Sequence, residues 1–69
     1  MSVFSERLIQ LRKDKEMSQA AFAKEIGVSS RTYQDYEYGK REPQVAIFAR
    51  IADFGGVSLD YLAGRTDTP

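Results

Sequence analysis

One stretch of the sequence spaces hydrogen-bonding side chains as neighbours on a single helix face. Its positions i, i+1, i+4 and i+5 are Ser30, Arg31, Gln34 and Asp35, and residues at this spacing share one side of an α-helix. The parallel N–H donors of Arg31 fit two adjacent acceptors on a planar partner. Asp35, one turn further on, either accepts hydrogen bonds from that partner or orients Arg31, and we favour the second role. The face is a candidate recognition surface, although any solvated helix face has similar polarity.

The residue types that catalysis and metal binding usually need are missing. The chain has no cysteine and no histidine, which removes disulfides, thiolate ligands and imidazole bases. There is no paired-carboxylate motif and no glycine-rich phosphate loop. The tyrosines are interpreted as packing residues rather than nucleophiles; they are Tyr33, Tyr36, Tyr38 and Tyr61. We therefore expect no enzyme, no metal and no cofactor, and no small-molecule ligand is evident.

Size and charge bound the class of protein. Sixty-nine residues form one domain, and 42% hydrophobic residues argue against disorder. The net charge is zero, which is unusual for a nucleic-acid-binding protein. Residues 7–41, however, carry eight basic and five acidic side chains, which weakly favours an anionic partner, with a solvated mixed-charge surface as the alternative. No apolar run approaches the roughly 20 residues of a membrane span, and no signal peptide is recognisable, so we expect a cytoplasmic protein.

Serine and glycine mark the ends of predicted helices along the whole chain. Helical apolar spacing begins at Phe4, with Ser2 or Ser5 as the cap, and the polar run 13–16 ends this helix. Two short helices follow over 19–26 and 30–38, capped by Ser18 and Ser29 and each followed by a glycine. A fourth helix carries an apolar stripe that consists of Val45, Phe48, Ile51 and Ala52.

A last short helix follows Ser58, and Gly64 ends it. No β-alternation is present, so the sequence predicts an all-α fold of five short helices. The domain spans residues 1–64, and residues 65–69 form a frayed C-terminal tail.

The connection between the second and third helices is the most informative feature. Only Gly27, Val28 and Ser29 join them, which is too short for antiparallel packing and forces a large crossing angle. Ala23 suits the point where the two helices approach closely, and inner positions such as Ile26 and Tyr33 pack beneath the turn. The second helix of this unit is thus expected to protrude from the surface.

The segment SQAAFAKEIGVS at 18–29 resembles the helix-turn-helix of the phage Cro/repressor-type regulators, the XRE family. Further matching features are Arg12, the stretch 36–40, Pro43 and the stretch 56–60. The resemblance runs from about Phe4 to Gly64. It implies a compact five-helix lambda-repressor-like domain, bacterial or phage-encoded. It also implies a sequence-specific regulator of transcription, a repressor that binds a palindromic operator in double-stranded DNA as a homodimer.

The resemblance also implies roles for individual residues. Positions that face DNA bases are Ser30, Arg31, Thr32, Gln34 and Asp35. Positions that contact phosphates are Gln19, Ser29, Lys40 and Arg41. Arg12 and Glu37 match a structural ion pair that joins the first helix to the end of the third. The dimer surface would lie around Leu59, Tyr61 and Leu62, although Leu59 and Leu62 more simply close the core.

Several residues depart from the family pattern. Phe54 and Gly55 exchange the usual small and large residues, and we expect Phe54 to fill the gap at Gly55. Tyr33 replaces an aliphatic residue, giving either a bulkier core or a phenol that reaches toward the DNA backbone, and Gln44 replaces a capping Ser or Thr. Asp35 and the neutral charge leave an alternative open, a protein-interaction module or antitoxin component with the same fold.

Overall fold

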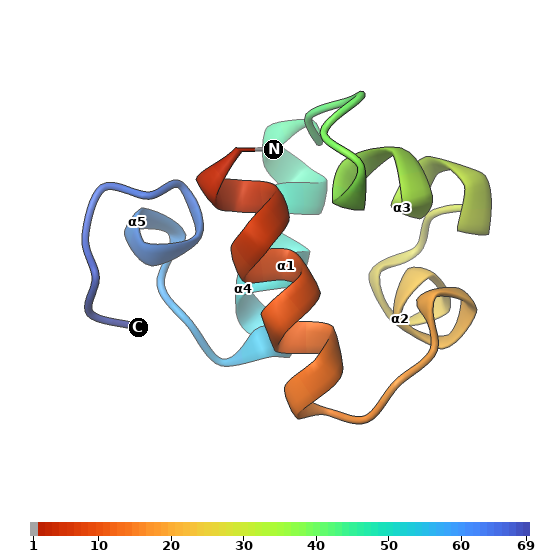
Figure 1. Cartoon of the computed structure of the whole chain (residues 1–69), viewed down its shortest axis with the longest axis horizontal. Helices are drawn as coiled ribbons and strands as arrows, with labels where there is room; N and C mark the ends of the chain where they lie inside the picture. The colour runs from red at the N-terminus through yellow and green to blue at the C-terminus, as the bar shows by residue number, and fades with distance from the viewer. Residues whose placement is uncertain (1) are drawn as a thin grey trace.

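The computed structural model describes residues 2–69, which contain five helices and no strand. The helices are α1 (Val3–Asp14), α2 (Gln19–Ile26), α3 (Ser30–Glu37), α4 (Val45–Gly55) and α5 (Leu59–Leu62) (Figure 1). The predicted all-α, five-helix fold is confirmed. Within the described range, the longest helix has 12 residues, and none has the length and apolarity needed to cross a membrane.

The serine caps expected from the sequence set four of the five helix starts. Ser2, rather than Ser5, caps α1, and its Oγ accepts from the Ser5 N–H at 3.1 Å. Ser18, Ser29 and Ser58 accept in the same way from the third residue after each. Gln44 precedes α4 without a side-chain cap bond. Each capping oxygen satisfies a backbone donor that the first helical turn would otherwise leave unpaired.

The core forms where α1, α2, α3 and α4 meet. Among its fully buried side chains are Leu8, Phe22, Tyr33 and Ile51. The Phe22 ring lies 5.3 Å from that of Tyr33 and 5.2 Å from that of Phe54. Aromatic side chains of this kind supply a large share of the apolar area that a small domain can bury.

Two packing expectations are corrected. The sequence predicts Val45 on the apolar stripe of α4, but its side chain is 83% exposed, because Val45 starts the helix beyond the edge of the core. Ile47 packs against the core instead. Leu11, not Phe54, occupies the space beside Gly55: a Cβ there would lie 2.9 Å from Leu11 Cδ1. Phe54 instead packs edge-on against Phe22.

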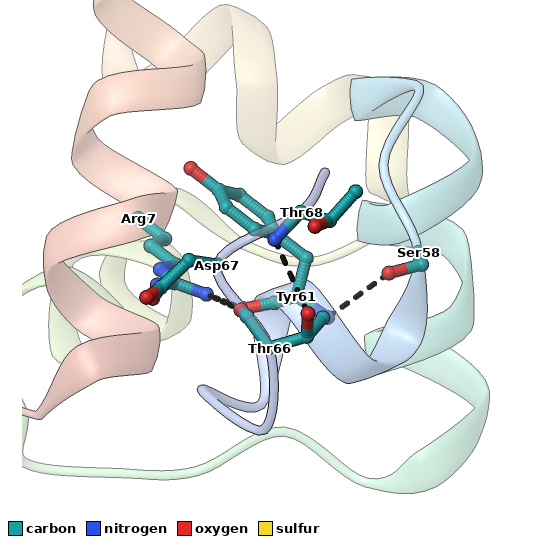
Figure 2. A network of polar contacts seen from close by, with 6 residues as sticks. All are labelled: Arg7, Ser58, Tyr61, Thr66, Asp67 and Thr68. Carbon is teal, nitrogen blue, oxygen red and sulfur yellow. Dashed lines mark hydrogen bonds and ion pairs between the residues drawn. The ribbon is translucent and has the colours of Figure 1, made fainter.

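The C-terminal segment folds back beside α1 and α5. Arg7 of α1 donates to the carbonyl oxygens of Tyr61 and Thr66 and to the Asp67 carboxylate, and its guanidinium lies 4.0 Å from the centre of the Tyr61 ring (Figure 2). The Asp67 carboxylate is fully exposed, so its ion pair adds little stability. Fraying of the tail stays a prediction.

Candidate nucleic-acid interface

The turn between α2 and α3 is built on Gly27. This residue has φ +78°, and a Cβ there would also lie 2.8 Å from the guanidinium of Arg50 on α4. The Val28 N–H donates to the Ala23 carbonyl at 3.0 Å, which closes the end of α2. Ala23 is itself buried. The positive φ therefore favours glycine here, and the short turn presents α3 at an edge of the molecule (Figure 1).

The outer face of α3 carries a loose ion pair. Arg31 Nε lies 3.6 Å from Asp35 Oδ1, and the two side chains are 83% and 22% exposed. Ser30 is exposed and Gln34 partly buried on the same helix. At 3.6 Å this is an electrostatic contact rather than a hydrogen bond. The arrangement keeps Arg31 beside a carboxylate while leaving its guanidinium in solvent.

Thr32 lies on a different side of α3 from Arg31. The Ser29 hydroxyl donates to Thr32 Oγ1 at 3.0 Å and accepts from the Thr32 N–H at 3.1 Å. Both residues line a shallow polar groove with Arg41, Glu42 and Gln44. Two expected phosphate contacts, Ser29 and Arg41, therefore meet at one groove. The uncapped start of α4 adjoins it, and a helix N-terminus favours negative charge.

The loop after α3 begins with a backbone bond from the Lys40 N–H to the Asp35 carbonyl at 2.9 Å. The side chains of Lys40 and Arg41 are exposed. The sequence thus places two cations within a few residues of the end of α3.

Arg12 of α1 and Glu37 of α3 form an ion pair that is largely shielded from solvent. Arg12 Nε donates to Glu37 Oε2 at 2.6 Å and Nη2 to Oε1 at 3.3 Å, while Nη1 donates to the Met17 carbonyl at 3.1 Å. The side chains are 18% and 3% exposed. Burial by itself would raise the pKa of Glu37, but the hydrogen bonds that Arg12 and Gln19 donate to its carboxylate outweigh burial and hold this pKa below its usual value. The pair stays charged at neutral pH.

Gln19 lies inside this network. Its Nε2 donates to Glu37 Oε1 at 2.9 Å, so the amide expected at a phosphate is here engaged by the protein. The sequence alone does not show this contact, because it depends on how the start of α2 meets the end of α3.

Tyr38 is a residue of this face that the sequence analysis interpreted only as a packing side chain. It is 56% exposed. It follows Gln34 by four positions and Arg31 by seven, the spacing of one helix face. This spacing in the sequence is the feature that could have identified Tyr38 as part of the outer face of α3. Tyr33, in contrast, is fully buried, so it enlarges the core and its phenol does not reach the surface.

Comparison with known proteins gives a consistent result. A family model described as helix-turn-helix matches residues 8–62. The chain is 40% identical over 60 residues to YqaE, an uncharacterized HTH-type transcriptional regulator of Bacillus subtilis, a match covering 87% of this chain and 52% of the relative. It is 41% identical over 63 residues to the cryptic phage CTXphi transcriptional repressor RstR of Vibrio cholerae, covering 91% and 56%. The chain therefore spans little more than half the length of these relatives.

The fold matches a solved structure closely. The crystal structure of the P22 c2 repressor protein in complex with a synthetic operator superposes with a TM-score of 0.87 at 27% identity, over 96% of this chain and 100% of that chain. The lambda-repressor-like architecture expected from the sequence is thereby confirmed. The chain belongs to the helix-turn-helix family, of the phage-repressor (XRE) type.

Proposed function

We propose that the chain is a transcriptional repressor that binds double-stranded DNA sequence-specifically, with α3 in the major groove and two copies on a palindromic operator. The relatives named as transcriptional regulators and the similar P22 c2 repressor–operator complex support this proposal. The observation that carries it is the outer face of α3, where Arg31 is solvent-exposed beside Asp35. A guanidinium so placed matches the O6 and N7 acceptors of guanine.

In this proposal the backbone contacts surround the reading face. Ser29 and Arg41 share the polar groove beside α3, and Lys40 lies in the loop next to it. Side chains of this kind position a protein on the duplex without reading its sequence. Ser30, Thr32 and Gln34 complete the proposed reading set around Arg31 and Asp35.

Two copies are proposed because one helix of eight residues reads too few base pairs for specificity. Of the leucines expected at the dimer surface, Leu59 is 48% exposed and is therefore available for contact between copies. Leu62 is fully buried and closes the core. The proposed dimer surface therefore centres on Leu59 and Tyr61.

Selection of bound duplexes from a random pool tests this function. We expect enrichment of a palindrome whose half-sites lie about one helical turn apart, together with two chains per duplex in sedimentation. Failure to retain any duplex at low salt would contradict DNA binding and favour the protein-interaction or antitoxin alternative. Enrichment of a single half-site would contradict the dimer alone.

A further inference from the structure

The buried polar network has one member without a hydrogen bond. The Tyr33 side chain is fully buried, and its hydroxyl has no hydrogen-bond partner among residues 2–69. A hydroxyl removed from water without a partner lowers the stability of the folded protein, and such groups are rare in folded proteins. Phenylalanine would fill the same space without that cost.

Glu37 is a candidate acceptor for the Tyr33 hydroxyl. It follows Tyr33 by four residues on α3, the spacing of neighbouring side chains on a helix. Tyr33 is close enough to the Glu37 carboxylate that each influences the pKa of the other, yet the hydroxyl makes no hydrogen bond of normal geometry. Burial is the main cause that raises the pKa of Tyr33, so the hydroxyl keeps its proton and is available as a donor.

The carboxylate already receives three donors. Arg12 reaches both oxygens, and Gln19 Nε2 lies 2.9 Å from Oε1. An ionised carboxylate accepts about four hydrogen bonds, so one position remains, and Tyr33 makes no bond there while Gln19 is in place. Gln19 is the donor whose departure is easiest, because it is neutral and sits only partly buried at the start of α2.

We propose that Tyr33 is a positioning residue that acts through Glu37: its hydroxyl takes over from Gln19 when the Gln19 amide turns outward to a DNA phosphate. The proposal rests on the proposed function for its DNA step. Without a substitute, releasing Gln19 would remove a donor from a buried carboxylate and weaken DNA binding by that amount. With Tyr33 in reserve, the carboxylate keeps three donors in both states.

Stability measurements on the free protein test the exchange without DNA. Tyr33→Phe alone is expected to leave Tm unchanged or raise it, because the hydroxyl has no hydrogen bond to lose. In Gln19→Ala the position on Glu37 is vacant and Tyr33 fills it. Adding Tyr33→Phe to Gln19→Ala should then lower Tm by about 5 °C or more, since a hydrogen bond to a charged group is lost. A lower Tm for Tyr33→Phe alone, or additive effects in the double variant, would overturn the proposal.

Binding measurements test the DNA step. Tyr33→Phe should weaken operator binding by about tenfold, although the residue is buried, and should have no further effect in the Gln19→Ala background. Thr68→Val is the control: it removes an exposed hydroxyl in the C-terminal segment, outside the proposed DNA-binding and dimer surfaces, and should bind as wild type does. Operator binding that is indifferent to Tyr33→Phe overturns the DNA step. If Arg31→Ala and Lys40→Ala also leave binding unchanged, the proposed function fails as well.

Discussion

Each face of α3 has a carboxylate paired with an arginine, and the two pairs differ in burial. Arg31 and Asp35 both belong to α3, whereas Glu37 pairs with Arg12 of α1. On the inner face, Arg12 and Glu37 are 18% and 3% exposed, with a 2.6 Å hydrogen bond. On the outer face, Arg31 and Asp35 are 83% and 22% exposed and 3.6 Å apart. A buried arginine–carboxylate pair is locked because unpairing leaves a charge without solvent, whereas an exposed one exchanges its partner at little cost. Burial, rather than residue type, separates the structural pair from the proposed reading pair.

The largest effect is expected on the inner face. Arg12→Met removes one partner and leaves the Glu37 carboxylate buried without a positive charge beside it. We expect a loss of about 3 kcal/mol of unfolding free energy, measured by thermal or urea denaturation. Arg31→Ala should leave stability within about 0.5 kcal/mol of wild type. Equal effects of the two changes would contradict the difference between the faces.

A pH titration should test whether the inner pair is charged. Because the pKa of Glu37 is lowered in the folded state, its contribution to stability is present above the unfolded value of about 4.3. That contribution is lost as the pH falls through the lower folded pKa. Urea unfolding of wild type and Glu37→Gln between about pH 6 and pH 3 should show the gap in stability narrowing toward acid. A constant gap would mean that Glu37 is not held ionised by Arg12.

The outer face should respond in DNA binding. Arg31→Ala should lose about 1–3 kcal/mol per half-site against the preferred operator and relax the preference at one symmetric pair of positions. Arg31→Lys should rescue only part of the loss, because lysine lacks the planar pair of donors. Arg65→Ala is the matched control, since Arg65 also forms a loose surface pair, 3.8 Å from Asp60. Uniform weakening on an operator set substituted at every position would make Arg31 a phosphate contact.

The smallest effect is expected beside α3. Lys40→Ala or Arg41→Ala should weaken binding to all duplexes alike and reduce the slope of log K against log salt by about one unit for each lost phosphate contact. The measurement is a set of titrations between about 50 and 200 mM salt. A loss confined to certain sequences, or an unchanged slope, would count against the proposed backbone role.

The sequence predicted what local chemistry decides. Ser18, Ser29 and Gly27 set helix ends through bonds to residues a few positions away, and those ends are where we expected them. Val45 could not be placed, because the apolar period does not say how far the core extends along α4. The contact of Leu11 with Gly55 and that of Gln19 with Glu37 join residues far apart in the chain, so they depend on how the helices pack. The exposure of Arg31 could be predicted from the sequence, because the spacing of polar residues along a helix is a local pattern.

The way Arg7 holds the end of the chain has a consequence for how freely that end can vary. Two of its hydrogen-bond acceptors are main-chain carbonyls, of Tyr61 and Thr66, and only the Asp67 contact depends on an acceptor side chain (Figure 2). Main-chain acceptors persist whatever residue carries them. Thr66 can therefore be substituted without removing the acceptor of its contact with Arg7, whereas substitution of Arg7 removes all three hydrogen bonds. Since the C-terminus lies at the opposite end of the long axis from α3 (Figure 1), a label attached there would leave the proposed DNA-binding face unobstructed.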